Sequence, residues 1–147
     1  MATGGAGFSD QERAAMRQRA EELAAMKGLK GLAKLQKENE ACLDAIEKLE
    51  GTDRAIAERV HVIVLEEAPH LNPKTFYGFP AYAKDGKVVV FYQPASKFST
   101  RYGTVSFDET AQLDDGPMWP VSFAVLEVTP EVEQRIRDQV RRAAPAA

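Results

Sequence analysis

Glutamate and histidine recur at a spacing of three residues at two places in this 147-residue chain, as Glu58/His61 and Glu67/His70. On a helix this spacing puts a carboxylate and an imidazole on one face, as in di-iron carboxylate bundles. Pro69 and the expected helix end disrupt the second pair. We therefore take Glu58 and His61 as candidate metal ligands, with iron as the candidate metal. An ion pair on the helix surface is the alternative.

A second candidate site combines aromatic rings with polar side chains between residues 74 and 119. Rings on a sheet are usually part of the core. Here, however, several polar heads fall near the same end of a predicted hairpin, and a ligand pocket pairs apolar walls with a few polar groups. The candidate ligand-binding residues are Lys74, Tyr77, Tyr82, Phe91, Gln93, Lys97 and Trp119.

Known catalytic arrangements are not recognisable in the sequence. Cys42 is the only cysteine, which excludes an internal disulfide and a multi-cysteine zinc site, and its place on an apolar helix stripe indicates a core residue. The glycines of residues 4–7 follow no strand and precede no Gly-Lys-Ser/Thr, so they do not form a phosphate loop. No combination of serine and histidine suggests a hydrolase triad. We expect a binding protein rather than an enzyme.

Composition and charge indicate one globular domain. The chain has 22 acidic and 19 basic residues, a net charge of −3 and 44% hydrophobic residues. Both signs occur in every third of the chain, so no basic stripe predicts nucleic-acid binding. No apolar run approaches the ~18 residues of a membrane span. We expect a cytoplasmic monomer or homodimer whose partner is a small molecule, a metal or another protein.

The strongest local signal is Asp85-Gly86, a dipeptide typical of type I′ hairpin turns. It predicts strands over residues 79–84 and 87–92, with Tyr82 opposite Val89. The period of two then places Tyr82, Phe91 and Gln93 on one face of the sheet. We expect no helix of the chain to cover that face. The other face is expected to pack against a helix, and it carries Phe79, Ala81, Ala83, Val88, Val90 and Tyr92.

Helices are predicted on both sides of this hairpin. A capping box, Ser9 to Glu12, starts the first helix, which glycines loosen near residues 28–31; the second ends at Gly51. The third, residues 52–67, has two apolar stripes, the second formed by Val62 and Leu65, and should be covered on both sides. The last helix starts at Pro130, with three expected i,i+4 ion pairs: Glu131/Arg135, Glu133/Arg137 and Asp138/Arg142. Further strands are expected at residues 103–107 and 121–128.

Residues 74–82 read Lys-Thr-Phe-Tyr-Gly-Phe-Pro-Ala-Tyr and are followed by Gly86-Lys-Val and by Trp119-Pro120. This segment resembles the YdhG-like family, a domain of unknown function that reads close to K-T-x-Y-G-M-P-A-Y, with Phe79 here in place of methionine. The resemblance extends over about residues 52–140. It implies an α+β domain whose antiparallel sheet, of about five strands, has helices mainly on one face. Some relatives are described as frataxin-like iron chaperones.

The expected organisation is a disordered start at residues 1–8, an N-terminal helical extension at 9–50, the YdhG-like domain at 51–143 and a frayed tail at 144–147. The resemblance implies a small cytoplasmic binding domain with iron chaperoning as its function. A module that binds a small molecule or a peptide on the aromatic hairpin face is the alternative.

Overall fold

The computed structural model describes residues 9–26 and 30–146. Our expectation for the first eight residues and the part of the expected glycine break at residues 27–29 fall outside this range; Gly31 is the first residue of α2. Ten elements follow one another along the chain: α1 (Asp10–Met26), α2 (Gly31–Glu47), α3 (Gly51–Glu67), β1 (Asn72–Phe76), β2 (Phe79–Lys84), β3 (Lys87–Gln93), α4 (Ala95–Phe98), β4 (Gly103–Phe107), β5 (Ser122–Val125) and α5 (Pro130–Ala143).

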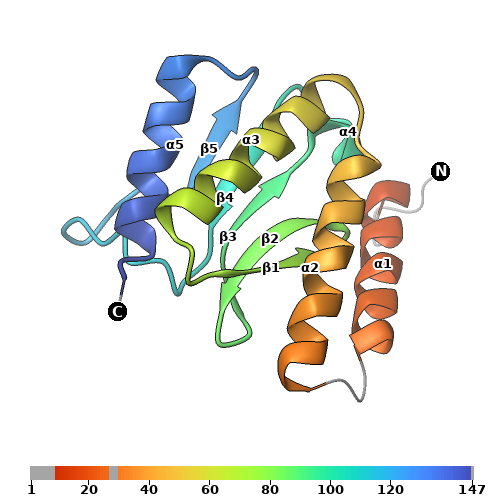
Figure 1. Ribbon diagram of the computed structural model, residues 1–147. Helices are drawn as coiled ribbons and strands as arrows, with labels where there is room; N and C mark the ends of the chain where they lie inside the picture. Colours follow the sequence, from red (N-terminus) through yellow and green to blue (C-terminus); the bar gives the residue numbers. More distant parts are fainter. Residues whose placement is uncertain (1–8, 27–29, 147) are drawn as a thin grey trace.

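The five strands form one antiparallel sheet in which every strand lies beside its neighbours in the sequence, from β1 at one edge to β5 at the other. Figure 1 shows α2, α3 and α5 across one face of this sheet, with α1 beside α2 at the β1 end. The predicted α+β class, with helices mainly on one face, is confirmed. Strand β1 and the short helix α4 were not among the predicted elements.

Helices and sheet share a single apolar core. Helix α2, the second helix of the expected N-terminal extension, contributes Cys42 and Ile46 to this core. Ala144, the first residue of the tail that we expected to fray, is also buried in it. The core side chains of the sheet are Tyr82, Val89, Val90, Tyr92, Val105, Phe107 and Val125.

Local signals in the sequence determine two helix starts. Ser9 Oγ accepts a hydrogen bond from the Glu12 amide at 3.1 Å, and Glu12 Oε1 accepts one from the Ser9 amide at 2.8 Å, which completes the predicted capping box. At α5, Thr129 Oγ1 accepts from the Val132 amide at 3.1 Å, and Pro130 occupies the first turn.

Two tight hairpin turns connect β1 to β2 and β2 to β3. Asp85 and Gly86 have φ values of 52° and 81°, as the predicted type I′ turn requires. Tyr77 and Gly78, with φ values of 52° and 85°, form a second two-residue turn between the paired Phe76 and Phe79. This second turn was not recognised in the sequence, because a tyrosine is unusual where the backbone is left-handed.

A β-bulge at Val89 changes the predicted faces of the hairpin. Ala83 pairs with Val88 as expected, but Tyr82 pairs with Val90, so Val89 is an extra residue on β3. From Tyr82 back to the start of β2, the pairing with β3 is therefore shifted by one residue from the predicted pairing. The prediction that Tyr82 lies on the uncovered face is therefore wrong: Tyr82 is 0% exposed under the helices. Phe91 does lie on the opposite face, where it stacks on Phe79.

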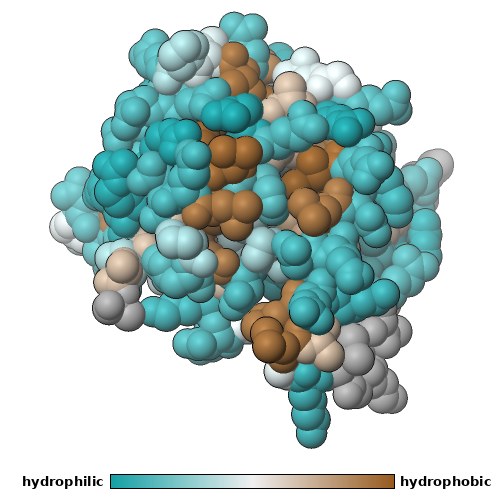
Figure 2. All heavy atoms as spheres, viewed as in Figure 1, coloured by the Kyte–Doolittle hydropathy of each residue, from teal (hydrophilic) through white to brown (hydrophobic). Residues whose placement is uncertain are grey.

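The second apolar stripe of α3 is not covered as we expected. Leu65 remains 41% exposed, and Val62 is only partly buried, because α1 and α2 pack beside the β1 end of the sheet rather than over α3. Figure 2 accordingly shows apolar side chains at the surface of the helical face. Within residues 9–26 and 30–146, no helix has the length and apolar character needed to cross a membrane.

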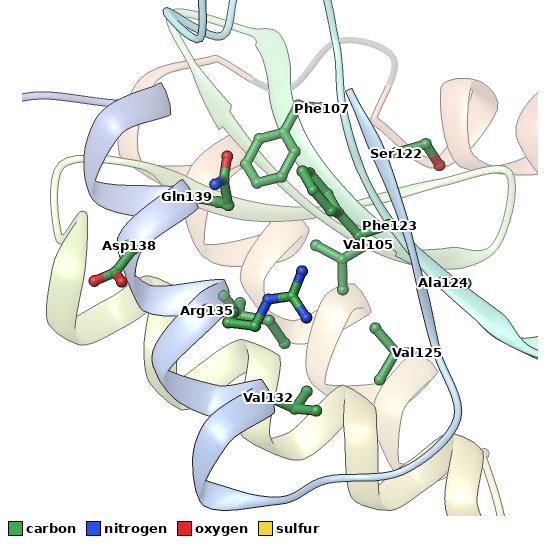
Figure 3. Close-up of a pocket in the computed structure, with 11 residues that line it drawn as sticks. Val105, Phe107, Ser122, Phe123, Ala124, Val125, Val132, Arg135, Asp138 and Gln139 are labelled. Atoms are coloured by element: carbon green, nitrogen blue, oxygen red, sulfur yellow. The ribbon is translucent and has the colours of Figure 1, made fainter. Parts of the chain in front are cut away.

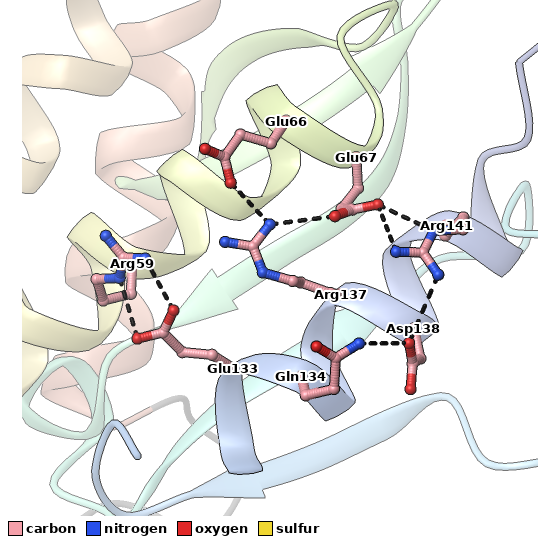
Figure 4. A network of polar contacts seen from close by, with 8 residues as sticks. All are labelled: Arg59, Glu66, Glu67, Glu133, Gln134, Arg137, Asp138 and Arg141. Atoms are coloured by element: carbon pink, nitrogen blue, oxygen red, sulfur yellow. Dashed lines mark hydrogen bonds and ion pairs between the residues drawn. The ribbon is translucent and has the colours of Figure 1, made fainter. Parts of the chain in front are cut away.

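Ion pairs connect α3 to α5 (Figure 4). Arg59 makes a two-pronged contact with Glu133, at 3.1 and 2.8 Å, and Glu67 receives both Arg137 and Arg141. The expected pairing of Glu133 with Arg137 within α5 is therefore wrong: the carboxylates of α3 lie within reach and offer better geometry than the i,i+4 neighbour. These contacts fix the α5 helix against α3.

Candidate functional site

Three of the seven candidate ligand-binding residues come together. Tyr77, Phe91 and Gln93 line one hollow of about 310 Å³ on the face of the sheet opposite the core. We call this the aromatic hollow; its other lining residues are Glu12, Ala15, Met16, Phe76, Phe79 and Phe98. The β1–β2 turn, β3, α4 and the first half of α1 each contribute to it.

The rings of the aromatic hollow are packed in contact geometries. Phe79 stacks on Phe91 with ring centroids 5.7 Å apart, and Phe98 meets Phe79 edge-on at 6.4 Å. Phe76 lies 4.6 Å from Tyr77 and 5.5 Å from Phe91. Such offset and edge-on pairs stabilise one another beyond simple burial. The result is a preformed apolar wall.

Tyr77 is held in this wall by a left-handed backbone. A φ of 52° costs a non-glycine residue about 1–2 kcal/mol, and asparagine or glycine would fit the turn at lower cost. The Tyr77 ring is only half-buried, so it is not a main core side chain. Strain of this kind often occurs at sites where a side chain must occupy one particular position.

Helix α1 lines the hollow with Glu12, Ala15 and Met16, and polar side chains farther along the helix contact the neighbouring turn and α4. The Gly78 amide donates to Glu22 Oε2 at 2.8 Å, and Lys97 Nζ donates to Gln18 Oε1 at 2.8 Å. The Arg19 guanidinium lies over the Phe76 ring, 5.4 Å from its centroid. The apolar side chains Met16 and Leu23 of the same helix stay exposed. Polar and cation–π contacts thus hold α1 at the edge of the site.

Lys97 and Lys74 do not line the aromatic hollow but lie near it. Lys97 borders a more polar cavity of about 360 Å³ between α1, α2 and the Tyr77–Gly78 turn. Burial lowers the pKa of Lys97, the positive charge of Lys48 lowers it further, and Glu22 opposes both effects. Lys74 projects from the edge strand β1, with Nζ 3.4 Å from Glu38 Oε2.

Tyr82 and Trp119, the other two candidates, lie elsewhere. The Tyr82 hydroxyl is in the core, 2.9 Å from His61 Nδ1. Burial raises the pKa of Cys42 to about 12, only partly opposed by its hydrogen bonds to Tyr82 and Ala81, so this thiol is an inert core residue. Trp119 packs against the core from the loop before β5.

The candidate metal ligands are each engaged with another residue. Glu58 Oε2 accepts from Arg54 Nε at 3.2 Å on the outer surface of α3, whereas His61 points inward to Tyr82. Burial lowers the pKa of His61, which favours a neutral imidazole. Among the residues that the structure describes, no three His, Cys, Asp or Glu side chains are grouped closely enough to hold a metal ion.

Six of the nine residues that line the hollow were not among the candidates, and Phe79, Phe98 and Met16 illustrate why. Phe79 was assigned to the wrong face because the bulge at Val89 has no clear sequence signal. Phe98 lies on a helix of only four residues, too short for a periodic pattern. Met16 lies on α1, a helix that we did not expect to border the hairpin. Only the dipeptide Tyr77-Gly78, which can form a tight turn, could have indicated where the rings converge.

Comparison of this chain with protein-family models, with curated proteins and with solved structures found no match. The YdhG-like resemblance therefore stays a prediction, and the assignment of function depends on the geometry of the site.

Proposed function

We propose that the chain is a small cytoplasmic binding domain, not an enzyme, whose aromatic hollow takes a neutral aromatic small molecule. The observation that carries the proposal is the left-handed Tyr77, whose half-exposed ring is kept at the hollow against a backbone cost of about 1–2 kcal/mol. The lone, buried Cys42 is compatible with a reducing compartment.

The lining of the hollow determines the chemistry of the ligand. Its walls are rings and aliphatic side chains, and a flat aromatic ligand can stack against Phe91 or Tyr77. Gln93 offers both a donor and an acceptor for one polar substituent. Glu12 is the only charged residue in the lining, and its carboxylate already accepts the Ser9 amide. A neutral ligand therefore fits better than an ion.

A thermal-shift screen of neutral aromatic compounds tests the proposal. A ligand at 100 times its Kd stabilises the folded state by about 2.7 kcal/mol, enough to raise the melting temperature measurably. The informative variant is Tyr77→Asn, which keeps the left-handed turn and removes the ring. Relief of strain should offset the lost ring contacts, so we expect its stability to change little while the ligand-induced shift disappears.

Asp85→Asn is the matched control, because it places asparagine at the same position of the other two-residue turn, where no ring is involved. It should leave the ligand-induced shift intact. If Tyr77→Asn retained the full shift with every active compound, the aromatic hollow would not be the binding site. If no neutral aromatic compound raised the melting temperature, the proposed ligand class would be wrong.

A further inference from the structure

A separate cavity of about 370 Å³ lies at the other side of the sheet, between α5 and the strands β4 and β5 (Figure 3). None of its lining residues borders the aromatic hollow. Its volume falls at the lower end of the range seen for small-molecule sites. The cavity is therefore large enough for a compact ligand.

Apolar and polar side chains both line this cavity, the polar ones being Ser122, Arg135, Asp138 and Gln139. Val105 and Val125 come from the sheet and are almost fully buried, and Ile136 closes the helix side. Phe107 and Phe123 meet edge-on with ring centroids 6.1 Å apart. When the alkyl chain or ring of a ligand enters between the sheet and α5, it loses contact with water, which favours binding.

Arg135 provides the positive charge of the cavity. Figure 3 shows its guanidinium beside Val105, Val125 and Val132, and the residue as a whole remains exposed to solvent. Within the described residues, no carboxylate forms an ion pair with Arg135, although Arg137 on the same helix is paired with Glu66 and Glu67. The expected pair with Glu131 is absent.

The acidic residue at the cavity does not neutralise this charge. Asp138 accepts a hydrogen bond from Gln134 at 2.9 Å and lies 3.7 Å from Arg141. Ser122 Oγ is likewise bonded to Ser106, at 2.8 Å. The Arg135 side chain is exposed to solvent and has no carboxylate partner within the described residues. It is complementary to the carboxylate of a ligand whose apolar group enters the cavity, since Arg forms two-pronged contacts with carboxylates.

We propose that this cavity binds a small amphipathic carboxylic acid. The apolar part lies between the sheet and α5, against Phe123 and Ile136, and the carboxylate pairs with the Arg135 guanidinium. This site is independent of the aromatic hollow, where no cation lines the wall. The proposal predicts a preference for monoanions over neutral and cationic molecules of the same shape.

Sodium octanoate is the probe, with octan-1-ol and octylamine as neutral and cationic analogues. Binding is followed by two-dimensional amide NMR of the full chain. We expect saturable shifts at Val105, Phe123 and Val132, and octanoate should bind about tenfold more tightly than octan-1-ol, a difference typical of one charge-assisted contact.

Two variants of α5 separate a specific contact from a general effect of charge. Arg135→Gln should remove the tenfold preference for octanoate. Arg142→Gln removes the same charge from the same helix at a position that does not line the cavity, and should bind octanoate like the unmodified chain. Val132→Phe keeps Arg135 and fills the space, so it should weaken octanoate and octan-1-ol alike.

Three results would overturn the proposal: equal losses in Arg135→Gln and Arg142→Gln, shifts centred on Tyr77 and Phe91, or no saturable shift with octanoate up to about 1 mM. Tyr77→Asn, the variant that tests the aromatic hollow, should leave octanoate binding unchanged. Failure of one site is therefore distinguishable from failure of the other.

Discussion

Replacing Gly78 by alanine tests both the left-handed turn and the docking of α1. Gly78 has a φ of 85°, and a Cβ there would overlap the side-chain amide of Gln18, whose Nε2 would lie 2.7 Å away. An alanine held in this left-handed backbone conformation costs about 1–2 kcal/mol of folding free energy. Displacement of Gln18 breaks its hydrogen bond to Lys97, a further loss of about 1 kcal/mol.

Alanine also restricts the unfolded chain, which favours folding by about 0.4–1 kcal/mol. The net effect of Gly78→Ala should be a loss of about 2 kcal/mol in the free energy of unfolding, measured by urea denaturation. Gly86→Ala is the matched control: Gly86 has a φ of 81° in the other hairpin, but nothing lies within 4 Å of its added Cβ. It should lose only about 1 kcal/mol.

A double-mutant cycle with Gln18→Ala isolates the contact term. In that background Gly78→Ala should cost about 1 kcal/mol less than in the unmodified chain, because the amide that the Cβ displaces is already gone. An equal cost in both backgrounds would show that α1 does not lie against the turn. A loss below about 0.5 kcal/mol in both would contradict the left-handed conformation of Gly78 itself.

Two further predictions concern His61. Burial lowers its folded-state pKa, so the unfolded chain binds a proton first, and the free energy of unfolding should fall as pH drops below about 6.5 toward that lowered pKa. His61→Gln should flatten this slope in urea titrations; a slope unaffected by His61→Gln would contradict the assignment. In calorimetric titrations with Fe²⁺, the double variant Glu58→Gln, His61→Ala should give the same heats as the unmodified chain. The reason is that Glu58 is hydrogen-bonded to Arg54 and His61 to Tyr82. A loss of about tenfold in affinity would instead support a metal site at this pair.

The parts of the fold that the sequence predicts are those set by neighbouring residues. Three short motifs each determine a local backbone geometry, and the structure contains all three geometries. They are the capping box of Ser9 and Glu12, the helix start at Thr129 and Pro130, and the turn at Asp85 and Gly86. The starts of α1 and α5 follow from two of these signals, whereas α2 and α3 begin without a side-chain cap.

Other features depend on contacts distant in sequence. The extra residue at Val89 reverses the facing of β2 relative to β3, and that one shift moved Tyr82 from the predicted site into the core. The polar contacts of α1 with the β1–β2 turn and with α4 are not detected by a search of the sequence for apolar stripes. For the candidate site, the sequence indicated the hairpin and three residues that the structure brings together in the aromatic hollow, Tyr77, Phe91 and Gln93, but not the helix beside them.

The order of strands in the sheet has a consequence for the speed of folding. Each strand pairs with the strand next to it in the chain, and the first two connections are two-residue turns. Little chain entropy is lost in closing such short loops. Strands β1, β2 and β3 can therefore pair before segments that are distant in the sequence come into contact. The slower step should be the closure of the longer loop between β4 and β5, after which α5 can pack on the finished sheet.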